Sequence, residues 1–163
     1  MLAIASPKRE LGTRAEARER ELERCLKMNP TYILMIDDDQ TMPIRGLNAM
    51  LASGADVAVI DAPAKDLPSS SNIRYHPNGE LYSATISCCA IKAEIFAKLE
   101  KPWFSSKFAI IEDRIVDGKI ISHYEEKYQD DNIGEDIFFI RKVIEAGFSV
   151  KVMPNLKCNH FNL

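Results

Sequence analysis

Two clusters of acidic residues carry the strongest chemical signal in this sequence. Asp37–Asp39 directly follow an apolar run at 32–36, and Glu135–Asp136 directly follow a glycine. An uninterrupted apolar run predicts a strand that is covered on both faces of a sheet. Because open α/β sheets bind ligands beyond the carboxyl ends of their strands, the aspartates are expected at a ligand site.

The spacing of the three aspartates indicates a cation. Side chains alternate along a strand, so Asp37 and Asp39 would share a face with Cβ atoms about 6.6 Å apart. At an effective dielectric constant of about 20, two such carboxylates repel by roughly 2–3 kcal/mol. Mg²⁺ or Mn²⁺ would relieve this repulsion and leave coordination positions for a substrate diphosphate. The competing interpretation, a turn or helix N-cap before Pro43, explains one aspartate but not three.

The second acidic cluster stands at the start of a predicted helix over 134–146. Backbone N–H groups and the helix dipole stabilise negative charge there, so one interpretation is simply that Glu135 and Asp136 help the helix to begin. The other is catalytic. A carboxylate fixed on a helix end is well placed to take the proton from an attacking hydroxyl.

Two isolated residues are further candidates for the site. His160 follows a predicted strand and a Pro154-Asn155 turn. From there it could reach the same sheet edge, where imidazole suits Mn²⁺, or it could be an ordinary surface residue. Trp103 is the sole tryptophan, and it could stack on a sugar ring or fill the core.

The elements that must position these residues alternate between strands and helices. This alternation predicts an α/β fold with a mostly parallel, mixed central sheet flanked by helices. The segment 61–79 is a predicted long loop, which serves as a lid or binding segment or is disordered, and 122–133 is a predicted polar loop. The predicted strands are 2–5, 32–36, 55–60, 85–92, 108–111, 119–121 and 148–153, and the predicted helices are 13–28, 43–53, 93–99 and 134–146.

The length and composition of the chain limit the number of domains and the kinds of partner that are expected. With 163 residues and 46% hydrophobic content, the chain 1–163 fits a single domain that buries roughly 70% of its unfolded surface. A net charge of −3, from 21 basic and 24 acidic residues, gives no reason to expect a nucleic-acid partner.

No apolar run approaches the ~20 residues of a transmembrane helix, so a cytoplasmic chain is expected. The four cysteines form no C-x-x-C pair and are expected to be reduced and buried.

Over roughly residues 14–160 the sequence resembles family 2 glycosyltransferases of the GT-A fold. The run YILMIDDDQTMP at 32–43 is similar to their strand and D-x-D signature, and GEDIFFIRKVIEAG at 134–147 is similar to their G-E-D helix. His160 resembles the histidine that often completes their metal site. Ala17-Arg18 matches part of an Ala-Arg-Asn helix, from which Glu19 departs. The segment 102–104 resembles one in some bacterial and viral members.

The resemblance implies a metal-dependent, inverting transfer of sugar from a UDP- or GDP-sugar to a hydroxyl acceptor. Asp136 would be the catalytic base and Glu135 would support it. Mn²⁺ or Mg²⁺ would be held by Asp37, Asp39 and His160, the donor by Asp37, Asp38 and Arg18, and the acceptor by Trp103. The aspartate triplet leaves open which two residues match the family's pair.

One departure concerns the beginning of the chain. Family members usually start with a strand, helix and strand that hold the nucleotide base, and most of this unit is absent before Leu2. The expectation is therefore a truncated GT-A fold, in which a partner subunit or homo-oligomer could supply base recognition.

Two other functions compete with transfer. Asp37-x-Asp39-x-Thr41 after an apolar strand also resembles the first motif of haloacid-dehalogenase phosphatases, in which the first aspartate is a nucleophile. Against this, Ile140 stands where a further acid would be expected. The other alternative is a decayed transferase domain that serves as a non-catalytic binding module.

Overall fold

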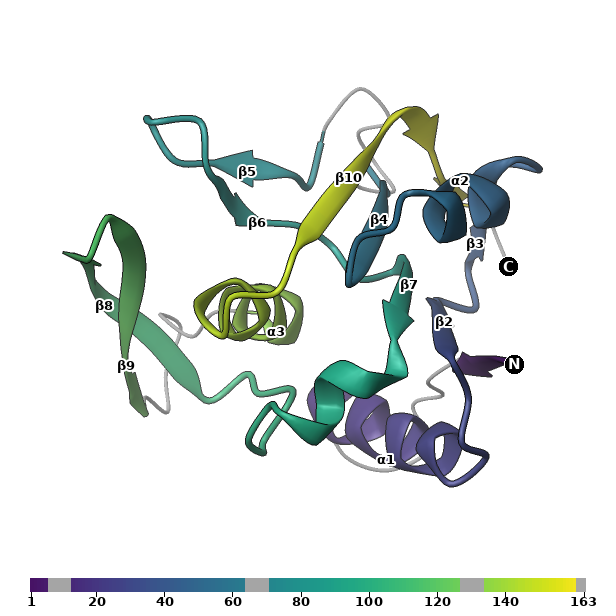
Figure 1. Cartoon of the computed structure of the whole chain (residues 1–163), viewed down its shortest axis with the longest axis horizontal. Helices are drawn as coiled ribbons and strands as arrows, with labels where there is room; N and C mark the ends of the chain where they lie inside the picture. Colours follow the sequence, from purple (N-terminus) through teal and green to yellow (C-terminus); the bar gives the residue numbers. More distant parts are fainter. Residues whose placement is uncertain (6–12, 64–70, 127–133, 161–163) are drawn as a thin grey trace.

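The fold is built on a mixed central sheet (Figure 1). The computed structural model describes residues 1–5, 13–63, 71–126 and 134–160. Strands β1 and β2 are parallel, as are β4 and β10, whereas β7 runs antiparallel to both β2 and β4. Across the sheet the order is β1 (Leu2–Ala5), β2 (Tyr32–Ile36), β7 (Cys88–Lys92), β4 (Val57–Asp61) and β10 (Val150–Lys157).

Helices cover both faces of this sheet. Helices α1 (Arg14–Leu26) and α3 (Glu135–Glu145), with the 3₁₀ helix η1 (Ala93–Ala97), pack on one face, and α2 (Gly46–Ala52) packs on the other. Within β2, Ile33 and Met35 join the first core and Leu34 joins the second. The continuous apolar run at 32–36 therefore serves two cores, which confirms the predicted α/β class with a mixed, helix-flanked sheet.

Helix α1 begins at a capping box. The Thr13 side chain accepts a hydrogen bond from the Glu16 N–H at 3.2 Å, and the Glu16 carboxylate accepts one from the Thr13 N–H at 2.8 Å. These reciprocal bonds fix the first turn of the helix. Further along this helix, Arg18 points into the protein and is only 2% exposed.

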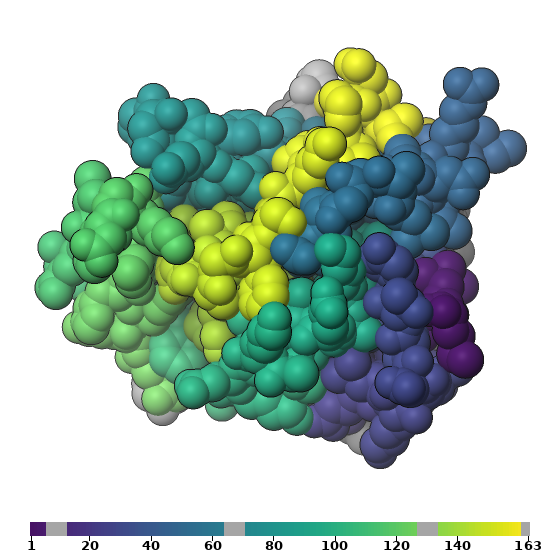
Figure 2. Space-filling model, viewed as in Figure 1, coloured from purple at the N-terminus to yellow at the C-terminus, as the bar shows by residue number. Residues whose placement is uncertain are grey.

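A long hairpin, β8 (Phe108–Val116) and β9 (Lys119–Glu126), stands beside the central sheet. Figure 2 shows it in green at the margin of the molecule. The shorter strands predicted at 108–111 and 119–121 were wrong in length. Asp117 and Gly118 adopt φ values of 51° and 77°, as expected of a two-residue turn whose twist matches the strands on either side.

The predicted loops also contain strands. Strand β9 takes up the first part of the segment 122–133, and the remainder, 127–133, lies outside the described residues. In the segment 61–79, residues 64–70 lie outside them too, and β5 (Arg74–Tyr75) pairs with β6 (Leu81–Ser83) just beyond. Strand β10 outruns its predicted end because Pro154-Asn155 forms an irregularity within it rather than a terminating turn.

Arg141 on α3 contacts both two-stranded units, β8–β9 and β5–β6. Its guanidinium is 1% exposed and donates to Ser122 Oγ of β9 at 2.7 Å and to the Glu145 carboxylate at 3.3 Å. It also lies over the Tyr82 ring of β6, 5.5 Å from the centroid. A buried cation is held in this way by an acid, a hydroxyl and an aromatic face.

Two further sequence expectations can be compared with the structure. Cys25, Cys88, Cys89 and Cys158 are all buried and free, as predicted. In the described part of the chain, no helix combines the length and apolar character needed to cross a bilayer.

At the amino end of β4, Asp56 joins three elements. Its carboxylate accepts from the Ser149 N–H at 2.9 Å, the Ser149 hydroxyl at 2.8 Å and Lys92 Nζ at 3.0 Å. The bonds from Ser149 and Lys92 lower the pKa of Asp56 to about 2. Hydrogen bonds to the ionised form stabilise it, so folding is favoured when Asp56 is charged.

We expect Asp56→Asn to lower the free energy of unfolding by about 1–2 kcal/mol at pH 7, after allowance for solvent screening. Because the folded pKa lies below the unfolded one, this contribution is complete above the unfolded value and is lost as pH falls towards about 2. Urea denaturation of both proteins at several pH values measures it. An equal gap between the two proteins at neutral pH and near pH 2 would contradict this account.

Candidate active site

The sequence-predicted acids lie around one edge of the central sheet. Because β2, β4 and β10 run in the same direction, their carboxyl ends share this edge with the amino end of the antiparallel β7. Asp37 follows β2 directly, and its N–H donates to the Ser87 carbonyl, just before β7, at 2.9 Å. The triplet thus begins where β2 separates from β7.

Arg18 brings the two acidic clusters together. Its Nη2 donates to Asp37 Oδ1 at 3.1 Å and to Oδ2 at 3.4 Å, and its Nε lies 3.2 Å from Glu135 Oε1. Glu135 is 7% exposed, and Arg14 Nε also approaches it, at 3.6 Å. The first helix therefore supplies the positive charge that allows carboxylates from β2 and α3 to lie close together.

Asp136 lies in the first turn of α3, beside Glu135. Its Oδ1 accepts a hydrogen bond from the Ile137 N–H at 2.8 Å. Burial raises the pKa of Asp136 above its ordinary value, and the neighbouring Glu135 charge raises it further. Gly134 leaves room for this carboxylate, because a Cβ there would lie only 2.6 Å from Asp136 Oδ1. The result is a carboxylate with more affinity for a proton than a solvated aspartate has.

His160 reaches the same edge through a short strand pair. Strand β11 (Asn159–His160) pairs antiparallel with β3 (Gln40–Thr41), which places His160 opposite Gln40. The Nδ1 atom of His160 lies 3.4 Å from Asp39 Oδ2, and Nε2 lies 2.9 Å from the Pro63 carbonyl oxygen. Since a carbonyl can only accept, Nε2 carries the proton, and a neutral ring would turn the Nδ1 lone pair towards Asp39.

The atoms around His160 fit part of a site for a divalent cation. His160 Nδ1 and Gln40 Oε1 are both buried without a hydrogen-bond partner, and they belong to residues that face each other in the β3–β11 pair. With the Asp39 carboxylate they offer one nitrogen and two kinds of oxygen donor, a set that Mn²⁺ accepts. The Pro63 carbonyl orients the imidazole as backbone carbonyls do at metal sites.

The predicted metal ligands are only partly brought together. Asp39 and His160 meet, but Asp37 pairs with Arg18 instead. Within the described ranges, no group of three or more histidine, cysteine, aspartate or glutamate side chains is arranged to hold a metal ion. Asp38 is exposed at the same turn.

Two predicted contacts with substrate need correction. Trp103 is 7% exposed, donates from Nε1 to the Leu99 carbonyl at 3.0 Å and packs edge-on against Phe96. Its ring belongs to the core and is not available to stack on an acceptor sugar. Arg18, at 2% exposure, is likewise too buried to contact a donor and acts by holding Asp37 and Glu135.

Sequence reasoning missed several residues of this site. Arg14 lies in the predicted helix 13–28 without a motif of its own, although it stands one helical turn before Arg18 and approaches the same glutamate. Gln40 immediately follows the triplet and carried no motif of its own. Ser87 and Pro63 contribute only backbone carbonyls, and no side-chain pattern can reveal such a contact.

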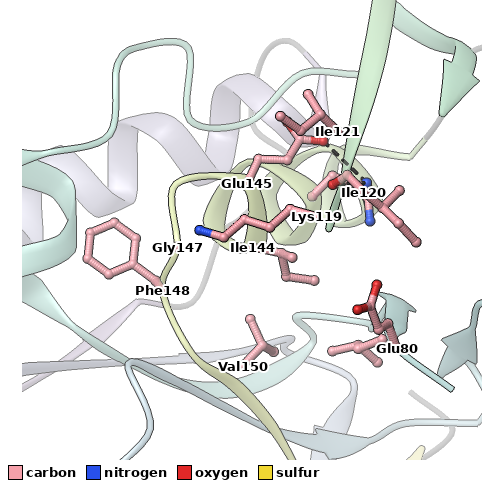
Figure 3. A pocket seen from close by; sticks show the side chains of 11 residues that line it. Glu80, Lys119, Ile120, Ile121, Ile144, Glu145, Gly147, Phe148 and Val150 are labelled. Carbon is pink, nitrogen blue, oxygen red and sulfur yellow. Dashed lines mark hydrogen bonds and ion pairs between the residues drawn. The ribbon is translucent and has the colours of Figure 1, made fainter. Parts of the chain in front are cut away.

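A cavity of about 380 Å³ lies at the other end of α3 (Figure 3). Its lining includes Ile144, Phe148, Val150 and Lys119, from α3, β10 and β9. None of Asp37–Asp39, Glu135 and Asp136 lines it. The cavity is therefore separate from the candidate site.

Comparisons with known proteins support the fold. No protein-family model and no curated protein matches this sequence. A solved structure, "Crystal Structure of A197 from STIV", superposes with a TM-score of 0.61 and 19% sequence identity, covering 94% of this chain and 70% of that chain. At that identity the similarity establishes a shared α/β architecture and nothing about activity.

Proposed function

We propose that this chain is a metal-dependent glycosyltransferase of the GT-A type, which transfers sugar from a UDP- or GDP-sugar to a hydroxyl acceptor with inversion. The observation that carries the proposal is the contact of Arg18 with both Asp37 and Glu135. Two acidic motifs far apart in the chain thereby meet at one sheet edge, where open α/β folds bind ligands.

Asp136 is the proposed base. Its raised pKa, caused first by burial and then by Glu135, brings its proton affinity closer to what abstraction from a hydroxyl requires near neutral pH. Glu135 is a positioning residue in this proposal. Arg18 and Arg14 lie against its side chain, at 3.2 and 3.6 Å, and its charge increases the basicity of Asp136.

Asp39 and His160 are the proposed protein ligands of Mn²⁺ or Mg²⁺, with Gln40 beside them. A divalent ion bound there would supply positive charge for the diphosphate that leaves with the nucleotide. Asp38 is exposed at the same turn and is proposed to face the donor. Asp37 stays on Arg18 and fixes the distance between the two acidic clusters.

The phosphatase alternative is less well supported. A nucleophilic aspartate needs an electron-rich carboxylate turned towards phosphorus, whereas the buried Arg18 donates to both oxygens of Asp37, at 3.1 and 3.4 Å, and withdraws electron density from them. The other alternative is a non-catalytic binding module. It would bind the nucleotide sugar as our proposal expects but would not transfer the sugar.

Calorimetry with and without Mn²⁺ tests donor binding. We expect a UDP- or GDP-sugar to bind in a Mn²⁺-dependent manner and His160→Ala to weaken this binding by about 10–100-fold, the usual range when a metal site is disturbed. His123→Ala, in the exposed hairpin strand β9, is the matched control and should bind as the wild type does. Equal binding by the two histidine variants would remove His160 from the site, and binding without turnover would favour the binding module.

A further inference from the structure

The outer edge of β8 is a surface that the proposed transfer does not use. In the part of the chain that the structure describes, β8 pairs with β9 alone. Residues 111–116 are all exposed, and they include Ile111, Ile115 and Val116, which are 42%, 78% and 47% exposed. A long, exposed, apolar edge strand is a template for pairing with another strand.

Hydrogen bonds to α3 show which backbone groups of the hairpin point outward. In an antiparallel pair, successive residues turn their N–H and C=O groups alternately towards the partner strand and away from it. On β9, the Ser122 N–H donates to the Glu145 carboxylate at 2.9 Å, and the Ile120 carbonyl accepts from Arg141 at 3.5 Å. Both residues therefore turn their backbone groups away from β8 and towards α3.

The residues opposite them on β8 are Asp113 and Ile115. By the same alternation, these two residues turn their N–H and C=O groups away from β9, towards the outside of the hairpin. These outward N–H and C=O groups of Asp113 and Ile115 form no hydrogen bond with any group of residues 1–5, 13–63, 71–126 and 134–160. Helix α3 thus binds the outward groups of Ser122 and Ile120 on β9, while those of Asp113 and Ile115 on β8 have no partner among the described residues.

We propose that β8 pairs antiparallel with β8 of a second copy of this chain, about a two-fold axis at Asp113. This register makes the edge self-complementary in charge, because Glu112 of each copy lies opposite Arg114 of the other. It also brings Ile111, which lies at the register shift between Ile110 and Glu112, beside Ile115 of the other copy. Such an isologous contact is the commonest kind in homodimers, and strand addition provides main-chain hydrogen bonds across it.

The charge at the axis is already compensated within each copy. The Asp113 carboxylate accepts from the Ser122 hydroxyl at 2.6 Å and lies 3.8 Å from the Arg141 guanidinium. A register centred on Arg114 would instead place two arginines face to face. A lipid surface fits less well, because Asp117 occupies the hairpin turn that would enter the bilayer first.

A charge-swap experiment tests the dimer. We expect wild-type protein to dimerise with increasing concentration in sedimentation velocity, and Glu112→Arg and Arg114→Glu each to raise the dimer dissociation constant at least ~10-fold, since each places like charges across the axis. An equal mixture of the two variants should dimerise as the wild type does, because in the mixed dimer both pairs between positions 112 and 114 are again of opposite sign. Both variants should fold, because Glu112 and Arg114 are exposed and their ion pair with each other lies at the surface, where such pairs contribute little.

Ile44→Lys is the matched control, since Ile44 is 98% exposed and lies outside the hairpin; this variant should dimerise normally. A wild type that stays monomeric at millimolar concentration would overturn the proposal, as would a mixture that fails to dimerise. Anionic phosphatidylserine vesicles that pellet the wild type but not Ile115→Lys, with no dimer in solution, would overturn it in favour of a lipid surface.

Discussion

Replacing Asp136 by asparagine is expected to lower turnover of the nucleotide sugar at least ~100-fold, the contribution of general acid–base catalysis. The asparagine amide keeps the shape of the carboxylate and can still accept from the Ile137 N–H, but it cannot take a proton. Mn²⁺-dependent donor binding should remain, because Asp39 and His160 are untouched. Steady-state rates combined with calorimetry measure both quantities. An unchanged rate would remove Asp136 from its role.

The stability of the same variant distinguishes lost chemistry from lost folding. Because burial raises the folded-state pKa of Asp136, the fold disfavours the ionised form, and stability rises as pH falls through that pKa. Asparagine removes this cost at neutral pH, so its melting temperature should equal or exceed that of the wild type. Asp117→Asn, in the hairpin turn, is the matched control and should keep full activity.

Replacing Arg18 by methionine is expected to lower the free energy of unfolding by about 3–5 kcal/mol, the usual cost of leaving buried charges without a partner. Asp37 and Glu135 would then face each other without the guanidinium that separates them. For a chain of this size, such a loss lowers the melting temperature by roughly 10 °C. Thermal and urea denaturation measure it.

Arg24 provides the control for this substitution. It lies on the same helix, is 70% exposed and pairs with Glu21 at 2.7 Å. An exposed pair contributes at most about 1 kcal/mol, so Arg24→Met should be nearly neutral. If Arg18→Met were equally mild, the bridge between the acidic clusters would not be what holds them together. Arg18→Met should also lose turnover at temperatures where it is still folded.

Much of the fold could be predicted because the central strands have a simple sequence pattern. The apolar run 32–36 and the turns around it locate β2 within the sheet, and the capping box at Thr13 and Glu16 marks the start of α1. The length of the hairpin β8–β9 was underestimated because its exposed strands alternate poorly between apolar and polar residues. The Asp117-Gly118 pair was the available signal for its turn.

The acidic residues of the site could be predicted from the sequence, but the contacts that hold them in place could not. Strand ends and helix starts locate Asp37 and Asp136 from sequence alone. The inward rotation of α1, which makes Arg18 a bridge rather than a ligand of the donor, follows from packing that local sequence does not encode. Trp103 shows the same limit, because only the packing around Phe96 distinguishes a core tryptophan from a sugar-stacking one.

Paramagnetic broadening by Mn²⁺ in the presence of a nucleotide sugar tests most directly whether both acidic clusters surround one ion. Amide signals of Asp39, His160 and the first turn of α3 at Glu135–Asp136 should broaden together at low Mn²⁺, while Gly118 at the hairpin turn stays sharp. Broadening confined to one cluster, or spread evenly over exposed acids including the hairpin, would contradict a single shared site.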